Sequence, residues 1–289
     1  MAGHKLEIFK RPPLDSPRML IGLSGWMDSG EVSTGTMNWL ITYLGAGKFA
    51  EIEPEGFYIY NFPGGMETSA LFRPYTKIVA GRIRTYHQPR NTFYFDKDND
   101  LVMFVGEEPN LNWQGFSDLI LAACSEMNVS EIYFVGSVAG LIPHTRDPRI
   151  FCSVSDDALK GKLAEFGVKF SDYEGPAGFI THLTVEAAKK GAGMSSLVAA
   201  VPAYVHGENL RCVETMLKTL KVILGLDIEL ESLRNLSDEF ERRLTNAVRD
   251  MPELAETITK LEADYDKEIF DLQMTDLQDW LHKKGIRLD

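Results

Sequence analysis

The first two-thirds of the chain alternates short apolar runs with longer segments whose apolar side chains recur every three or four residues. The short runs predict β-strands, and they lie at residues 19–23, 56–60, 77–80 together with Ile83, 101–105, 132–135 and 197–201. The amphipathic segments predict helices, and they lie at residues 31–44, 116–127, 155–167 and 179–190. Because strands that are apolar on both faces alternate with helices, the pattern predicts an α/β fold with a mostly parallel sheet covered on both sides.

The pattern changes at residue 226, after which no β-rich segment follows and helix formers dominate. Apolar residues keep a helical spacing over residues 233–247 and again over residues 254–272. Pro252 stands between the two stretches, where it suits the first turn of a new helix. We therefore expect two antiparallel helices joined at a tight corner.

A third, short helix is expected at residues 276–284, with Thr275 as its cap and Gly285 at its end. No further strand is expected in this part of the chain. The sequence thus predicts two units, an α/β domain at residues 1–225 and a helical appendage at residues 226–289.

Charge narrows the range of partners. The chain has 42 acidic and 30 basic side chains, a net charge of −12, which disfavours nucleic acid and anionic membranes as partners. The appendage holds 17 of the acidic and 9 of the basic side chains, a net charge of −8. A solvated outer face explains this charge, and so does a surface that binds a protein partner.

Cysteine usage and the absence of long apolar runs indicate a cytoplasmic protein. Cys124, Cys152 and Cys212 are too few and too dispersed for a disulfide framework or a zinc site, so we expect buried thiols. The first 13 residues lack the apolar core of a signal peptide. The longest apolar run, residues 197–205, contains a proline and is too short to cross a membrane.

Two glycine-rich loops resemble known functional motifs but lack residues that those motifs require. Residues 25–30 follow a strand and open a helix, but Glu31 and Val32 stand where a phosphate-binding loop needs lysine and serine or threonine. Residues 136–140 place Val138 where a nucleophile elbow needs serine. The chain has no complete set of catalytic or metal-binding residues of a standard kind, and we expect no cofactor.

Candidate functional side chains lie beyond the C-terminal ends of predicted strands, where open α/β sheets bind ligands. These candidates are Trp26, Asp28, Glu107, His144, Thr145 and Arg146. In a shared cleft, His144 would act as an acid or base and Arg146 would clamp an anion. Two prolines and an Arg–Asp pair at residues 143–148 also describe a rigid structural loop. Both interpretations stay open.

Further candidates lie on other loops. Tyr173, Gly175 and Pro176 precede a helix whose N-terminal amides would bind an anion, although helix initiation explains the same composition. His206 lies past the last strand, where it could approach His144. Of the tryptophans, we expect Trp26 and Trp113 to reach a shared cleft or interface.

Five segments, taken in order, resemble the proteasome assembly chaperone family, in the bacterial and archaeal form of the second chaperone's family. Residues 21–30 look like its Gly-Trp-x-Asp-x-Gly signature, and residues 107–116 resemble its Glu-Pro-x-x-x-Trp segment. Residues 143–146 and 173–176 match two more, and residues 201–205 resemble its Val-Pro-His-Tyr strand end, with Ala203 replacing the histidine.

The resemblance implies a three-layer α/β/α fold similar to that of nucleoside phosphorylases, a C-terminal helical region, and a role as an oligomeric assembly factor without established catalysis. Fold similarity to phosphorylases does not imply their chemistry. Some archaeal relatives dock the proteasome α-ring through a terminal hydrophobic-Tyr-x tail. This chain ends in residues 286–289 without a tyrosine, so that docking mode is not expected.

The leading hypothesis is therefore a non-enzymatic oligomeric scaffold or assembly-chaperone-like protein, whose partners are further copies of itself and a protein bound through the C-terminal helices. A hydrolase or phosphorylase-type enzyme, or a ligand sensor, using the cleft at the strand ends is the alternative. An enzyme should hold several candidate groups within hydrogen-bond reach in one pocket. A scaffold should use them in pairs that stabilise loops.

Overall fold

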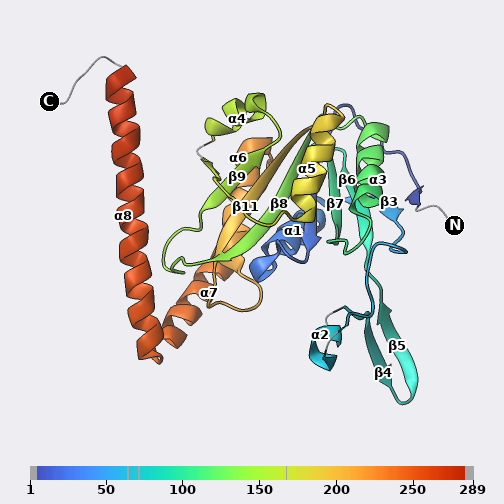
Figure 1. Cartoon of the computed structure of the whole chain (residues 1–289), viewed down its shortest axis with the longest axis horizontal. Coiled ribbons are helices and arrows are strands. Elements are labelled where there is room, and N and C mark those ends of the chain that lie inside the picture. Colours follow the sequence, from blue (N-terminus) through green and yellow to red (C-terminus); the bar gives the residue numbers. More distant parts are fainter. Residues whose placement is uncertain (1–4, 64, 71, 167, 284–289) are drawn as a thin grey trace.

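A nine-stranded sheet forms the centre of the computed structural model, which describes residues 5–63, 65–70, 72–166 and 168–283 (Figure 1). The strands, in their order across the sheet, are β1 (Leu6–Ile8), β3 (Gly47–Ile52), β6 (Asn91–Asp96), β7 (Leu101–Glu107), β2 (Arg18–Ser24), β8 (Glu131–Gly140), β11 (Gly193–Pro202), β9 (Ile150–Val154) and β10 (Lys169–Phe170). The four central strands, β7, β2, β8 and β11, are parallel to one another. Antiparallel pairs extend the sheet on both sides of this centre.

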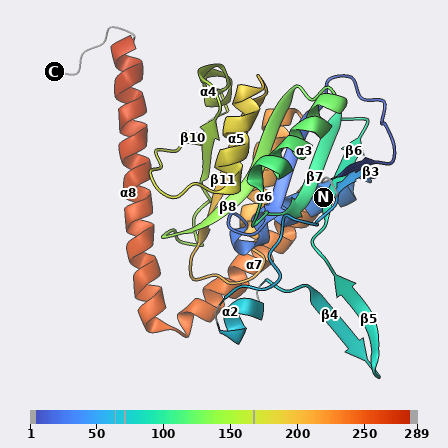
Figure 2. The same ribbon diagram turned by 45° about the vertical axis from the view of Figure 1, so that its right-hand side comes forward.

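Helices cover both faces of the sheet, as the sequence predicts. They are α1 (Val32–Leu44) and α6 (Leu210–Leu224) on one face, and α3 (Trp113–Glu126) and α5 (Phe179–Lys189) on the other (Figures 1 and 2). The short helix α4 (Asp157–Ala164) follows β9. The predicted α/β fold with helical layers around a central parallel sheet is confirmed.

The central strands are continuously apolar because both of their faces are buried. In β2, Leu20 packs into the core beneath α1 and α6, whereas Met19 and Ile21 pack into the core beneath α3 and α5. Gly22 lies where α1 crosses β2, and a Cβ atom there would lie 2.3 Å from the Cγ atom of Met37. A larger residue at this position would push α1 off the sheet.

The segment between β3 and β6 leaves the body. The prediction of a strand at residues 56–60 is wrong: this segment forms a turn that pairs with no strand, and the Phe57 ring packs edge-on against Phe116. The predicted strand around residues 77–80 is real but belongs to a separate hairpin, β4 (Tyr75–Val79) and β5 (Arg82–His87), with the short helix α2 (Met66–Ala70) before it. We call residues 73–90 the arm, which projects from the body (Figures 1 and 2).

The C-terminal part consists of α7 (Glu231–Arg249) and α8 (Pro252–Lys283), which meet at a corner beside Pro252. The two helices diverge in a V, and α8 stands beside the body (Figures 1 and 2). The separate helix predicted from Asp276 is wrong, because α8 continues through it to Lys283. Its predicted end at Gly285 lies outside the described residues.

The start of this C-terminal part belongs to the hydrophobic core. Leu226, Ile228, Leu230 and Leu233 are all buried in the same cluster as the inner face of α6. Cys124, Cys152 and Cys212 are free and buried, and burial raises the pKa of the Cys124 and Cys212 thiols to about 12. In the part of the chain that the structure describes, no helix has the length and apolarity needed to span a membrane.

Candidate functional site

The loop after β2 serves to start α1. The Asp28 carboxylate accepts hydrogen bonds from the backbone N–H of Thr34 (3.1 Å) and from its hydroxyl (2.7 Å). The buried Ser33 hydroxyl accepts from the Leu23 N–H at 3.0 Å and donates to the Val135 carbonyl at 2.5 Å, which ties α1 to β2 and β8. Burial raises the pKa of Asp28, and the hydrogen bonds from Thr34 oppose that shift. Asp28 thus places a carboxylate where a phosphate-binding loop would hold its ligand.

Glu108, directly after β7, joins two loops. Its Oε2 atom accepts from the Trp26 N–H at 2.9 Å, and its Oε1 atom accepts from the Phe179 N–H at 3.1 Å, at the N-terminus of α5. Gly25 has a φ of +125°, and a Cβ atom there would lie 2.9 Å from the Cβ atom of Glu108. The anion site that the sequence suggests at this N-terminus therefore already holds a carboxylate of the chain itself.

The other two helices that start at this edge of the sheet are capped in the same way. The Asn112 side chain accepts from the Gly115 N–H in the first turn of α3. The Asn209 side chain accepts from the Cys212 N–H at 3.0 Å in the first turn of α6. At all four helix starts, a side chain of the protein bonds to a backbone amide that a ligand would need.

Several apolar side chains at this edge remain open to solvent. Trp26 is 75% exposed, Tyr173 is 71% exposed and Leu141 is 82% exposed. Trp113, in contrast, packs against Phe179, and its indole N–H donates to the Pro109 carbonyl at 2.8 Å. Trp26 alone of the two tryptophans is thus available for an interface.

His144 is buried in the loop that follows β8. Its Nδ1 atom lies 2.8 Å from the Tyr204 hydroxyl, which also accepts from the His144 N–H, and its Nε2 atom lies 3.1 Å from the Thr245 hydroxyl on α7. Burial lowers the pKa of His144. With both ring nitrogens bonded within the protein, the imidazole holds the loop against α7.

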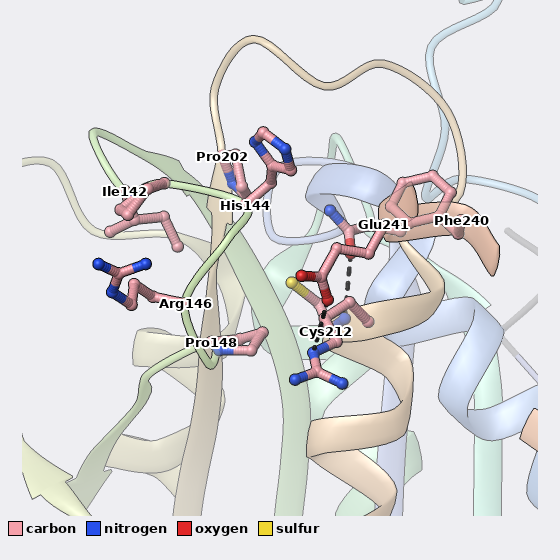
Figure 3. A pocket seen from close by; sticks show the side chains of 11 residues that line it. Ile142, His144, Arg146, Pro148, Pro202, Cys212, Phe240 and Glu241 are labelled. Atoms are coloured by element: carbon pink, nitrogen blue, oxygen red, sulfur yellow. Dashed lines mark hydrogen bonds and ion pairs between the residues drawn. The ribbon is translucent and has the colours of Figure 1, made fainter. Parts of the chain in front are cut away.

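Arg146 points outward and binds α8. Its guanidinium donates two hydrogen bonds, each 2.8 Å long, to the Asp266 carboxylate, while the neighbouring Thr145 hydroxyl donates to Glu262. Arg149 lies over the Tyr265 ring, 3.9 Å from its centroid. Figure 3 shows His144 and Arg146 pointing in different directions around a small cavity of about 10 Å³, roughly the space of one water molecule. The loop is a clamp for α8.

Replacing Arg146 with alanine is expected to loosen α8 rather than to remove a ligand site. Amide hydrogen exchange at residues 258–268 should become faster, because the two charge-assisted bonds to Asp266 are lost. Arg146→Lys should have an intermediate effect, since a lysine cannot make the paired contact.

Arg243→Ala is the matched control, because Arg243 pairs with Glu239 within α7 and should leave α8 exchange unchanged. Unaltered exchange in Arg146→Ala, combined with the loss of an anionic ligand, would instead favour the site interpretation.

A cleft of about 450 Å³ lies between the base of the arm and the ends of β2 and β7. Glu107 lines it together with Arg73, His87 and several tyrosines, and burial raises the pKa of Glu107. The candidates at the strand ends therefore do not share one cleft: Glu107 lines this cleft, whereas His144 and Arg146 line the small cavity under their own loop.

The remaining candidates are scattered. Gly175 and Pro176 lie in the exposed loop before α5, where the Tyr173 hydroxyl donates to the Pro176 carbonyl at 3.2 Å. His206 is exposed in the loop after β11, whereas His144 is buried. The sequence analysis does not predict the capping roles of Glu108, Asn112 and Asn209. For the two asparagines the signal was present, because each directly precedes a helix.

Comparisons with known proteins agree on one family. A model of the PAC2 family matches residues 22–248. A proteasome-assembly chaperone homologue of Mycobacterium tuberculosis, Rv2125, is similar in structure, with a TM-score of 0.73 and 26% identity over 83% of this chain and 99% of that chain.

Two other solved structures share the fold. The protein of unknown function Rv2714 of Mycobacterium tuberculosis has a TM-score of 0.82 and 19% identity over 96% of this chain and 93% of its own. The archaeal proteasome activator PbaB of Pyrococcus furiosus has a TM-score of 0.63 and 23% identity over 86% of this chain and 99% of its own. No protein with a curated function matches the sequence significantly.

Proposed function

The chain belongs to the PAC2 family, and from this we propose that it is a non-enzymatic, oligomeric protein of the assembly-chaperone type. It would bind subunits of a larger complex while that complex forms. Rv2125, described as a proteasome-assembly chaperone homologue, makes proteasome subunits the first partners to test. Such a protein works in the cytoplasm, where these subunits assemble.

One observation carries this proposal: the polar side chains at the edge of the sheet where ligands usually bind are already bonded within the protein. Asp28 and Glu108 place carboxylates at the N-termini of α1 and α5, and both ring nitrogens of His144 are bonded within the protein. An enzyme needs groups that are free to contact a substrate. These side chains instead stabilise loops, while Trp26 and Tyr173 stay exposed, as is common at protein interfaces.

The C-terminal helices supply a surface for the client. The V of α7 and α8 presents exposed carboxylates, among them Asp238, Glu253 and Asp264. The clamp at residues 143–149 holds α8 beside the body, so this acidic surface has a defined position. We propose that the client binds this acidic V, that α8 is the part of it that binding requires, and that the body folds without α8.

An order-of-addition assay tests the proposal. The α-type and β-type proteasome subunits of the same organism are mixed with the full chain, and native mass spectrometry follows ring formation. We expect a transient complex that contains the chain and an incomplete ring, and finished particles that have released the chain.

The matched control is a chain truncated after Asp250, which lacks α8. It should give no transient complex while remaining folded. If the full chain forms no complex with either subunit type and does not change the rate of ring formation, the proteasome-directed role is refuted.

A further inference from the structure

The arm has a surface that is unusual for a part of the protein exposed to solvent. Every residue of β4 is exposed, and Tyr75, Ile78 and Ile83 are each more than 60% exposed. The strand register places Ile78 and Ile83 opposite each other on one face of the hairpin, and the exposed Tyr86, opposite Thr76, lies on the same face. Tyr75 lies on the other face, against His87. An isolated two-stranded hairpin is only marginally stable in water. An apolar face of this kind marks an interaction site.

The arm is also strongly basic. Residues 73–90 contain five basic and no acidic side chains, in a protein with a net charge of −12. Lys77, Arg82 and Arg84 are exposed on the hairpin itself, and none of them forms an ion pair with any residue that the structure describes. The arm therefore fits an apolar surface with acidic side chains around it.

The protein has such a surface of its own. We call the carboxyl edge the exposed side chains on the loops around the C-terminal ends of the central strands. It comprises the apolar Trp26, Leu141 and Tyr173 and the acidic Glu31, Glu174 and Glu208. Glu108 holds two of these loops together, because it bonds to both Trp26 and Phe179. These three acidic side chains form no ion pairs within the described part of the chain.

Geometry and charge decide which contact the two surfaces make. The arm projects away from the body, so its tip does not cover the carboxyl edge of its own chain (Figures 1 and 2). Pairing of two arms would bring their basic side chains together, which is unfavourable. An arm and the carboxyl edge of another copy are complementary in both charge and apolar character.

We propose that the arm of one copy docks on the carboxyl edge of a second copy, with Ile78, Ile83 and Tyr86 facing Trp26 and Tyr173 and the basic side chains facing Glu174 and Glu208. This inference rests on the proposed self-association and identifies its interface. Because each copy carries both surfaces, reciprocal docking closes a symmetric assembly. The acidic V of α7 and α8 stays free for a client.

Reversing the charges tests the contact. One variant carries Arg82→Glu and Arg84→Glu, and the other carries Glu174→Arg and Glu208→Arg. All four side chains are exposed, so both variants should fold, as circular dichroism will verify. Each variant alone should self-associate roughly tenfold or more weakly than the unaltered chain, because its arm and edge then repel each other.

An equimolar mixture of the two variants should restore the assembly, since each arm again meets an edge of opposite charge. The control variant carries Lys97→Glu and Arg242→Glu. It changes the net charge by as much as the arm variant does, at exposed sites outside the arm, and should assemble normally. Persistent assembly of either variant alone, or a mixture that stays monomeric, would overturn the proposal. The proposed function is tested separately. If the arm variant folds and still forms the transient complex with client subunits, the proposed function holds whatever the outcome for the docking contact.

Discussion

Truncation after Gly225 is expected to abolish folding, whereas truncation after Asp250 should leave a folded body. The first cut removes Leu226, Ile228, Leu230 and Leu233, which are at most 8% exposed. At about 1.5–3 kcal/mol for each side chain, the lost burial amounts to about 6–12 kcal/mol. The whole stability of a domain is about 5–15 kcal/mol. The measurement is thermal unfolding of both purified products, together with the fraction that stays soluble on expression.

The cut after Asp250 provides the comparison. Among the side chains of α8 that the structure describes, Ile258 is the buried apolar one, worth about 1.5–3 kcal/mol. If the chain cut after Gly225 were soluble and unfolded cooperatively, the body would end at residue 225. That result would also remove the start of α7 from the core.

Glu108→Ala is expected to lower the free energy of unfolding by about 2 kcal/mol, because two hydrogen bonds to a carboxylate are lost at a partly solvated site. The loops that carry Trp26 and the start of α5 should then move independently. Urea unfolding measures the first effect. Hydrogen exchange at residues 25–30 and 173–180 measures the second.

The neighbouring carboxylate is the control for this substitution. Glu107 makes no side-chain hydrogen bond to a described residue, so Glu107→Ala should leave stability nearly unchanged. Glu108→Gln keeps one acceptor oxygen and should lose about half as much as Glu108→Ala. Equal stability of Glu107→Ala and Glu108→Ala would mean that Glu108 does not join the two loops.

The sequence predicts the buried centre of the fold better than its margins. Strands β2 and β8 are predicted correctly, because short apolar runs bounded by turn residues are typical of strands buried on both faces. The strands β3, β6 and β9 mix polar with apolar residues and were missed. Helix α6 was also missed, although Val213, Met216, Leu217, Leu220 and Leu224 repeat at helical spacing and all are buried. That signal was present in the sequence.

The site is harder to predict because its bonds join residues that are distant in sequence. Glu108 binds backbone amides 82 and 71 residues away, and Arg146 binds a carboxylate 120 residues away. Residue type alone makes these groups look like catalytic candidates, because the same carboxylates and imidazoles serve both in catalysis and in loop stabilisation. The exposure of Trp26 likewise depends on which loops surround it. Local patterns contain none of this information.

The central claim is that the exposed edge and arm serve protein association rather than catalysis. Light scattering coupled to size-exclusion chromatography of the unaltered chain tests it most directly. We predict a single species whose mass is two or more times the monomer mass of 32.5 kDa, stable on dilution. A mass of 32.5 kDa across a wide range of concentrations would contradict the account, because the apolar arm and Trp26 would then have no partner copy.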